Sequence, residues 1–357
     1  MARASSDEVR KSATCEFLNL ADDYIDDLSS VIDMEAIRKS GIRIGVDPLD
    51  GAAIAYWKPI ADRYGLNIEV TNPTIDPCFG FMTLDHDGKI RMECSNPHAM
   101  AGLLSLKNRF DIAWGNDADA DRHGIVTLTS GLTNPNHFLA VAIHYLVKHR
   151  QQWPVKAAIG KTLVSSTAID LVAADVQREI CEMPVGFKWF SAGLLDGEIC
   201  FAGEESAGAS FLRRDGSAWT TDKDGIILGL LAAEITAVTG RDPAVYYERL
   251  VGRLGRSYSA RVDSLATTEA KETLKKIRPA SIADVTLAGD PILKKTVNAS
   301  GNGTAIGGIK VETTNGWFAA RPQAPRIFVK IYAESFRSSE HLAAILGQAR
   351  QIVSSLQ

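Results

Sequence analysis

Three aspartates at every second position follow an apolar segment, and this run constrains the chain more than any other feature. It is Gly115-Asn116-Asp117-Ala118-Asp119-Ala120-Asp121-Arg122, directly after the apolar residues 110–114. Like charges this close repel one another and are driven towards protonation, whereas a bound divalent cation keeps them ionised. Because carboxylate oxygens are hard ligands, the run predicts a Mg²⁺ site after a strand, with Asp117, Asp119 and Asp121 as ligands.

The aspartate run also has other interpretations, of which the simplest is a solvated loop with Arg122 as a local counter-charge. A calcium EF-hand loop needs glycine at its sixth position and glutamate at its twelfth, where this chain has Arg122 and Leu128. A phosphatase with an aspartyl nucleophile also places paired aspartates at a strand end. A gap of two residues after the expected strand and the third aspartate favour a metal site over that nucleophile.

Length and composition limit the chain to about two or three domains with well-formed cores. It has 357 residues, of which 45% are hydrophobic. A net charge of -4 and a pI of about 6.0 provide no cationic surface for nucleic acid or an anionic membrane. No stretch approaches the roughly 18 apolar residues of a membrane span, and the N-terminus lacks the apolar core of a signal peptide. We therefore expect a cytoplasmic protein with no nucleic-acid or membrane partner.

The periodicity of the chain predicts two similar α/β segments and a different C-terminal one. In both α/β segments, strands alternate with helices, and the last apolar strand runs through a glycine into an acidic loop. Ligands bind at this edge of open α/β sheets. From about residue 253, strands with alternating apolar and polar residues precede a closing helix, as in an antiparallel sheet. The expected strands are 42–46, 66–70 and 110–114, then 157–163, 180–185 and 199–202, and finally 309–313, 317–321 and 328–332. The expected helices are 51–64, 99–107, 165–179 and one from about 340.

Four motifs in the right order closely resemble the α-D-phosphohexomutases, in particular the bacterial phosphoglucomutases, over nearly the whole chain. They are the aspartate run, Val185-Gly186-Phe187-Lys188-Trp189-Phe190, Gly203-Glu204-Glu205-Ser206-Ala207-Gly208 and Thr221-Asp222-Lys223-Asp224-Gly225. The resemblance extends to Thr133–His137 and to Asn315–Pro322. It implies a phosphohexomutase-like α/β fold, with two related mixed α/β domains followed by an α+β C-terminal domain. We expect a metal-binding domain at 29–150, a sugar-binding domain at 151–252 and a phosphate-binding domain at 253–357.

The resemblance implies a transfer reaction on hexose phosphates. In the family, Mg²⁺ on the aspartate loop assists transfer of a phosphoryl group between an enzyme phosphoserine and a hexose phosphate, and glucose 1,6-bisphosphate is an activator. The resemblance implies that Asp117, Asp119 and Asp121 bind the metal. It also implies that Arg122 lies beside the phosphoserine and substrate as a catalytic residue. This agrees with the chemistry, because a divalent ion neutralises charge on the transferred phosphoryl group.

Glu204, Ser206 and Lys188 are further candidates implied by the resemblance. Glu204 and Ser206 fall on the sugar-binding loop, where a carboxylate and a hydroxyl bind neighbouring ring hydroxyls; the alternative is that Glu204 caps the loop or a following helix. Lys188, between two aromatic residues, is a candidate catalytic proton acceptor or phosphate contact with a partly desolvated amine. The alternative is an ordinary side chain that extends into water. Lys223 and Asp224 fit either the same cleft or an exposed turn.

Two family features are missing from the sequence. The family's first domain carries the phosphorylated serine in a Thr-Ala-Ser-His-Asn-Pro loop, so residues 1–28 are predicted to be a lead-in helix or a remnant of that domain. The nearest string, Cys94–His98, lies in the part resembling the second domain, and Ser95 is therefore predicted to be structural. In the last domain, Arg321-Pro322 is followed by residues 323–326, Gln-Ala-Pro-Arg, instead of Ser-Gly-Thr-Glu. Loss of both hydroxyls and one backbone donor weakens that phosphate site, leaving Arg321 and Arg326 as candidate substrate-binding cations.

These features support two hypotheses. In the first, the chain is the major part of a phosphoglucomutase whose phosphoserine domain is a separate chain or was lost from the gene model, and it interconverts glucose 1-phosphate and glucose 6-phosphate only when that domain is supplied. In the second, it is a non-catalytic remnant that binds Mg²⁺ and sugar phosphates. The altered loop favours the second hypothesis, because splitting a gene does not require that loop to change.

Overall fold

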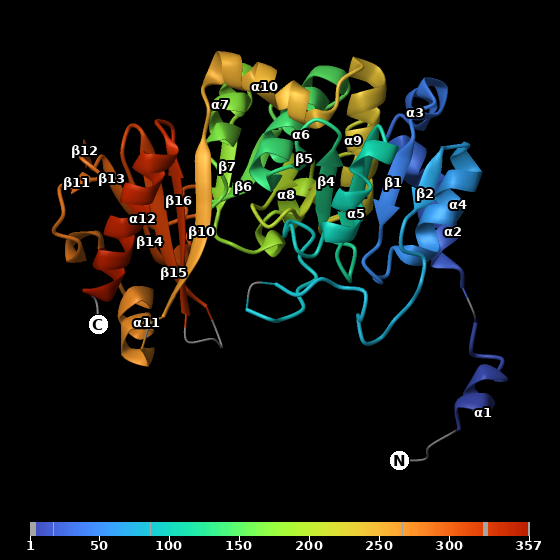
Figure 1. Cartoon of the computed structure of the whole chain (residues 1–357), viewed down its shortest axis with the longest axis horizontal. Helices are drawn as coiled ribbons and strands as arrows, with labels where there is room; N and C mark the ends of the chain where they lie inside the picture. Colours follow the sequence, from blue (N-terminus) through green and yellow to red (C-terminus); the bar gives the residue numbers. More distant parts are fainter. Residues whose placement is uncertain (1–4, 17, 86, 266, 324–327, 356–357) are drawn as a thin grey trace.

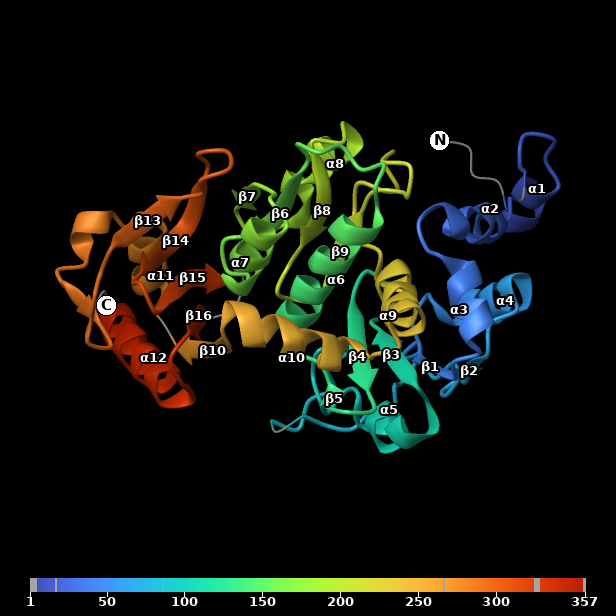
Figure 2. The same ribbon diagram turned by 90° about the horizontal axis from the view of Figure 1, so that it is seen from above.

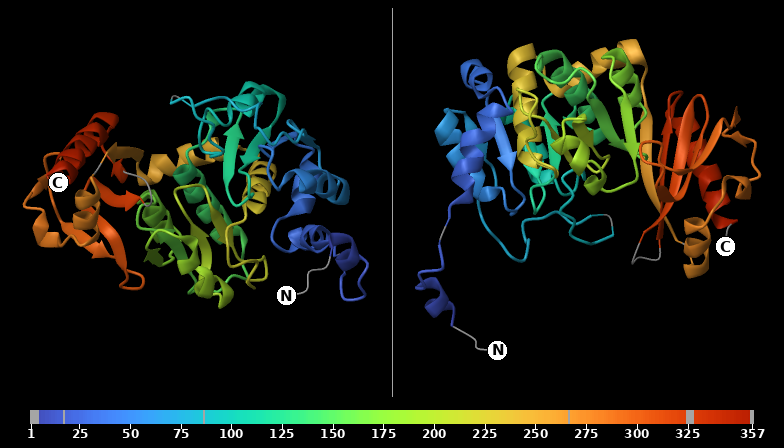
Figure 3. Two further views of the ribbon diagram at one scale, coloured as in Figure 1. Left: turned by 90° about the horizontal axis from the view of Figure 1, so that it is seen from below. Right: turned by 180° about the vertical axis from the view of Figure 1, so that it is seen from behind.

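In the computed structural model, which describes residues 5–355 except 17, 86, 266 and 324–327, three units lie in a row (Figure 1). A first α/β unit lies at one end, a second α/β unit in the middle and a C-terminal unit at the other end. The short helix α1 (Ser6–Arg10) projects away from the first unit, and helix α2 (Leu20–Asp27) packs against that unit (Figure 3). No helix of the described residues is long and apolar enough to cross a membrane.

The first sheet has the strand order β2-β1-β3-β4-β5, in which β1 pairs in parallel with β2 and β3, and β4 is antiparallel to β3. Strands β1 and β3 are buried along their whole length, as expected for parallel strands covered on both faces. Gly41 and Gly65 end helices α3 and α4 in the left-handed conformation. The bounds are β1 (Ile44–Asp47), β2 (Ile68–Val70), β3 (Ile112–Asn116), β4 (His123–Thr127), β5 (Gly131–Leu132), α3 (Met34–Ser40), α4 (Ile54–Tyr64) and α5 (Ala101–Ser105).

The second sheet repeats this arrangement. Its order is β7-β6-β8-β9, with β6 parallel to β7 and β8, and β9 antiparallel to β8. The two acidic loops therefore occupy equivalent places, one between β3 and β4 and the other between β8 and β9. The predicted relationship between the two α/β segments is confirmed. The bounds are β6 (Ala158–Thr162), β7 (Ile180–Met183), β8 (Ile199–Gly203), β9 (Ala209–Phe211), α6 (Pro135–His149), α7 (Ala168–Asp175), α8 (Ser191–Leu195), α9 (Gly225–Thr239) and α10 (Pro243–Leu254).

Helix α9 joins the two α/β units. It follows the second sheet in the chain but packs on β3 and β4 of the first as well as on β9 (Figure 2). Gly229 allows this approach, because a Cβ there would lie 2.3 Å from the indole nitrogen of Trp114. The two units consequently share one continuous hydrophobic core, which fixes their acidic loops relative to each other.

The C-terminal unit is an antiparallel sheet of order β10-β16-β15-β14-β13 with a closing helix, α12, as predicted, and it has a further helix, α11, that was not predicted. Glu334 of β16 anchors it to the second unit. Its buried carboxylate accepts hydrogen bonds from the Ser166 hydroxyl, the Thr167 N–H (2.7 Å) and the Trp317 indole N–H (2.8 Å). The bounds are β10 (Tyr258–Leu265), β11 (Thr286–Leu287), β12 (Asp290–Pro291), β13 (Lys294–Asn298), β14 (Ala305–Glu312), β15 (Gly316–Gln323), β16 (Phe328–Ser335), α11 (Thr268–Lys275) and α12 (Ser339–Ser354).

Several predicted element boundaries differ from the structure: the helices predicted at 51–64 and 99–107 cover only Ile54–Tyr64 and Ala101–Ser105, and two further differences follow. Strand β3 continues to Asn116, so Asp117 follows the strand directly rather than after a gap of two residues. The helix predicted over 165–179 covers only Ala168–Asp175. Ser165 before it belongs to a turn closed by a hydrogen bond to the Thr162 carbonyl (2.9 Å), and Val176 ends the helix.

Candidate functional site

Three loops meet where the first and second units join. We call them the aspartate loop (117–122), the glutamate loop (204–208) and the lysine loop (221–225). Arg122 and Gly208 form an antiparallel bridge between the first two. Gly225 N–H donates to the Ala120 carbonyl (2.9 Å), and a Cβ at Gly225 would lie 2.1 Å from the Arg122 carbonyl. The chain folds this tightly only because position 225 is glycine.

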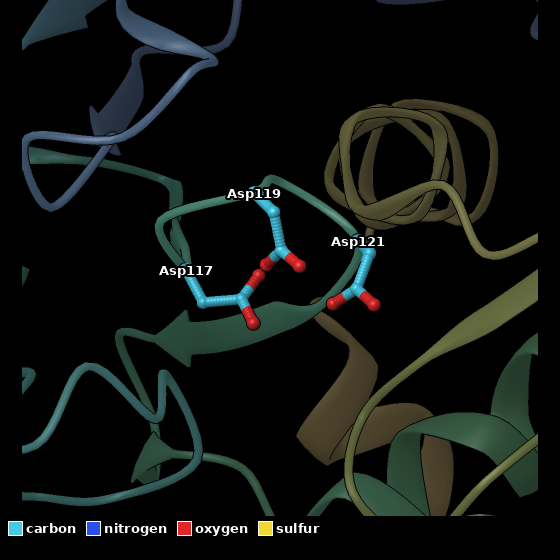
Figure 4. Close-up of side chains that lie close together, drawn as sticks. All are labelled: Asp117, Asp119 and Asp121. Carbon is cyan, nitrogen blue, oxygen red and sulfur yellow. The ribbon is translucent and has the colours of Figure 1, made fainter. Parts of the chain in front are cut away.

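The aspartate loop brings its three carboxylates together. One oxygen from each of Asp117, Asp119 and Asp121 lies within 4.8 Å of the others, and the side chains face one another inside the loop (Figure 4). The loop turns back at Ala120, whose φ is 58°, and is closed by the Arg122 N–H, which donates to Asp117 Oδ1 (3.0 Å). The alternate spacing seen in the sequence therefore places all three aspartates around one point.

Two cationic side chains, Arg122 and Lys223, lie close to the aspartate cluster but contact its members unequally. Arg122 Nε lies 3.4 Å from Asp117 Oδ2 and from Asp121 Oδ1, without hydrogen-bond geometry, whereas Lys223 Nζ lies 2.6 Å from Asp121 Oδ2. Burial, with the charges of Asp121 and Asp119, raises the pKa of Asp117 to about 7. The nearby cations therefore do not offset the effect of burial on Asp117.

A divalent cation fits this donor set. Octahedral Mg²⁺ with oxygens at about 2.0–2.1 Å separates its ligands by roughly 3–4 Å, so small side-chain rotations would bring the three carboxylates into place. A bound cation would oppose this rise in the pKa of Asp117, since a cation favours the ionised form.

The raised pKa of Asp117 predicts a pH-dependent stability. A carboxyl group whose folded pKa is about 7 stabilises the fold below its unfolded pKa near 4, and this stabilisation is lost as pH rises through 7. With EDTA present, we expect the free energy of unfolding to fall by about 1–2 kcal/mol between pH 5 and pH 8, after allowance for solvent screening. Mg²⁺ should flatten this dependence, and so should Asp117→Asn without Mg²⁺. Urea unfolding at several pH values measures the effect, and equal slopes for the wild type and Asp117→Asn would contradict it.

The glutamate loop presents a buried carboxylate beside a hydroxyl. Glu204 Oε1 accepts the Gly186 N–H (3.1 Å), and burial and then the charge of Glu205 raise the pKa of Glu204. Ser206 is half-buried on the same loop. The Glu204 oxygens keep unused lone pairs, so the loop can accept hydrogen bonds from neighbouring sugar hydroxyls.

The remaining residues singled out in the sequence lie outside the three loops. Lys188 is exposed, with Nζ 5.2 Å from the Trp189 ring centroid, so the desolvated amine expected from its aromatic neighbours is not found. Its catalytic role stays a prediction. Arg321 is half-buried on β15, and its Nε donates to the Ile306 carbonyl (2.9 Å). Arg326 lies outside the described residues. Ser95 lines a cavity of about 260 Å³ between the first unit, the second unit and the C-terminal unit.

The structure decides between the two interpretations of Lys223. It also shows a residue that the sequence analysis missed, Arg261. The sequence left Lys223 open between a cleft and an exposed turn, and only 16% of its side chain is exposed, between the other two loops. Its signal was the Thr221–Gly225 motif. Arg261 of β10 lines the same cavity as Ser95 and pairs with Glu93 (3.2 Å). No sequence signal distinguished it from any other strand arginine.

Comparison with known families and proteins gave consistent matches. Family models of the phosphoglucomutase/phosphomannomutase α/β/α domains match the chain, domain II at residues 22–130 and domain III at 134–254. The chain is 54% identical over 354 residues to a phosphoglucomutase from Komagataeibacter xylinus, covering 99% of this chain and 64% of that protein. It is 26% identical over 271 residues to phosphoglucomutase 1 from Drosophila melanogaster, covering 72% of this chain and 46% of that one. The chain thus spans less than two thirds of the length of these curated relatives.

Solved structures share the fold. A putative phosphomannomutase from Thermus thermophilus matches with a TM-score of 0.73 and 22% identity, over 95% of this chain and 67% of that one. The open form of the Paramecium phosphoglucomutase parafusin matches with a TM-score of 0.74 and 19% identity, over 96% and 64%. An N-acetylphosphoglucosamine mutase from Aspergillus fumigatus, solved with GlcNAc-6P and magnesium, matches with a TM-score of 0.57 and 13% identity, over 94% and 70%.

Proposed function

The chain belongs to the phosphoglucomutase/phosphomannomutase family, and we propose that it forms the metal- and sugar-binding part of a phosphoglucomutase. When a phosphoserine domain completes it, this part would interconvert glucose 1-phosphate and glucose 6-phosphate. The observation that carries the proposal is the meeting of the aspartate and glutamate loops, joined by the Arg122–Gly208 bridge. A metal site and a sugar-hydroxyl site then lie side by side, as transfer of a phosphoryl group to a sugar requires.

Each loop has a distinct chemical task in this proposal. Mg²⁺ bound by Asp117, Asp119 and Asp121 would neutralise charge on the transferred phosphoryl group. Arg122, held beside these carboxylates, contributes a second positive charge near the reacting group. Glu204 and Ser206 orient the sugar through its ring hydroxyls.

The phosphate contacts are the less complete part of the proposed site. Arg321 supplies charge for the non-reacting phosphate, together with Arg326, and Lys188 contacts a phosphate or accepts a proton. Glucose 1,6-bisphosphate is the proposed activator. In support, a serine-to-alanine variant of the Aspergillus mutase has also been solved in complex with glucose 1,6-bisphosphate.

Glucose 1-phosphate binding tests the sugar site directly. We expect calorimetry with Mg²⁺ present to show binding that Glu204→Gln weakens by about 10–100-fold, because a hydrogen bond to a charged group contributes roughly 1.5–3 kcal/mol. Glu198→Gln, at an exposed carboxylate before β8, removes the same charge as a matched control and should bind like the wild type. Equal affinities for Glu204→Gln and the wild type would exclude this sugar site.

A further inference from the structure

The side chain of Lys223 is built into the contact between the aspartate and glutamate loops. Its aliphatic stem lies directly over Gly208, where a Cβ would come 2.3 Å from the lysine Cδ. Its amine lies 2.6 Å from Asp121 Oδ2 and 3.8 Å from Glu204 Oε2. One ammonium group therefore faces a carboxylate of the proposed metal site and a carboxylate of the proposed sugar site.

The residue that follows Lys223 is firmly held by hydrogen bonds, so rearrangement at this point is left to the lysine side chain. The next residue, Asp224, caps helix α9 through the Ile226 N–H (3.0 Å) and Ile227 N–H (3.2 Å). Its carboxylate also accepts hydrogen bonds from the Tyr24 hydroxyl (3.0 Å) and the Trp219 indole N–H (2.9 Å). The reachable partners of the amine are then the two carboxylates already beside it.

A divalent cation changes which of these partners the amine prefers. When the three aspartates bind an ion, the Asp121 carboxylate coordinates it, and the positive charge of the ion repels the nearby ammonium group. Glu204 is the second carboxylate in reach, and an ammonium group with three donors can pair with it after a small rotation. Pairing would fix the orientation of the Glu204 side chain before sugar binds, which lowers the cost of ordering it.

We propose that Lys223 is a positioning residue that couples the two loops. It holds Asp121 in the metal-free protein and turns to Glu204 when a divalent cation binds. Metal binding and sugar-phosphate binding then strengthen each other by the same factor, as linkage requires. The inference rests on the proposed function, because it takes the aspartate loop as the metal site and the glutamate loop as the sugar site.

Mn²⁺ titration of the full chain by calorimetry, with and without saturating glucose 1-phosphate, tests the coupling. Lys223→Met should bind Mn²⁺ about tenfold more tightly without sugar phosphate, because the competing charge is gone. It should also lose most of the gain in Mn²⁺ affinity that glucose 1-phosphate causes in the wild type. Lys223→Arg, which keeps the charge, should restore much of that gain. Lys58→Met removes an exposed lysine paired with Asp62 and should behave like the wild type.

Two further variants separate coupling from a general charge effect. In the Glu204→Gln background, Lys223→Met should cause no further loss of coupling, because both changes break the same contact. Gly208→Ala should displace the lysine stem without removing the charge and also lower the coupling, provided that thermal melting shows a folded protein.

The outcomes distinguish this inference from the proposed function. If the wild type binds no Mn²⁺, or Asp119→Asn binds it equally well, the metal site itself fails and the inference fails with it. If the wild type binds Mn²⁺ through Asp119 but Lys223→Met changes neither the affinity nor the coupling, the inference alone is overturned and the proposed metal site stands.

Discussion

Asp119→Asn is expected to weaken Mg²⁺ or Mn²⁺ binding at least about a hundredfold. Among the described residues, the nearby cations contact Asp117 and Asp121 but not Asp119, so a bound ion would be the main source of positive charge beside Asp119. Loss of an outer-sphere partner alone typically costs about 10–100-fold in metal affinity, and loss of a ligand should cost at least as much. Calorimetry with Mn²⁺ measures the change. We expect the wild-type affinity itself to be weak, because in the family the phosphoserine supplies a further ligand.

The same substitution should leave the fold intact. Asp119 is exposed, and its removal relieves repulsion on Asp117, so the metal-free variant should be at least as stable as the wild type at pH 8. Asp196→Asn, at an exposed carboxylate after α8, is the matched control and should retain Mn²⁺ binding. Unchanged affinity in Asp119→Asn would favour the solvated-loop interpretation. Tight wild-type binding that Asp119→Asn abolishes would correct the expected weakness while supporting the site.

The fold was largely predictable because the central strands of the two α/β sheets, β1 and β6, pair in parallel with both of their neighbours. Buried parallel strands leave short apolar runs, such as Ile44–Asp47 and Ile112–Asn116, bounded by glycines and polar turns. The placement of helix α9 was not predictable. Its apolar sequence shows that it is buried on most sides, but the contact of Gly229 with Trp114, which places it on the first sheet, joins residues far apart in the chain.

In the candidate site, too, local features were predictable from the sequence and contacts between distant segments were not. The aspartate cluster was predicted because alternate residues on one tight loop must lie close together whatever surrounds them. Lys223 was left undecided because its burial depends on Asp121 and Gly208, which belong to other loops. For Lys188, aromatic neighbours in the sequence suggested desolvation, but the short helical turn Phe187–Trp189 leaves the amine in water against one ring face.

Adding a separately produced first domain of a related phosphoglucomutase is expected to produce glucose 6-phosphate from glucose 1-phosphate where the chain alone produces none. The sequence contains the proposed metal and sugar loops but no Thr-Ala-Ser-His-Asn-Pro loop, and a phosphoryl carrier cannot be replaced by a residue lacking its geometry. We expect a rate at least about a thousandfold above background, because correct positioning of reacting groups is worth several orders of magnitude. A coupled assay with Mg²⁺ and a trace of glucose 1,6-bisphosphate measures it.

Two controls make the complemented activity specific. Replacing the phosphorylated serine of the added domain with alanine should abolish turnover, and so should Asp119→Asn in this chain, because each removes one half of the transfer machinery. The Asp196→Asn chain should be complemented as well as the wild type. Turnover that survives the loss of either half would mean that the added preparation, rather than the joined site, performs the reaction.

The remaining outcomes separate the two functional hypotheses through the phosphate loop. Turnover by the chain alone would contradict the absence of a nucleophile. A third outcome is no turnover with or without the added domain, although Mn²⁺ and glucose 1-phosphate still bind. This outcome would assign the defect to the sequence after Arg321-Pro322, where Gln-Ala-Pro-Arg lacks both hydroxyls of Ser-Gly-Thr-Glu. Charge from Arg321 can retain affinity while orientation is lost, and orientation carries most of the rate. Restoring Ser-Gly-Thr-Glu at 323–326 should then recover turnover with the added domain, whereas continued silence would leave a binding protein without mutase chemistry.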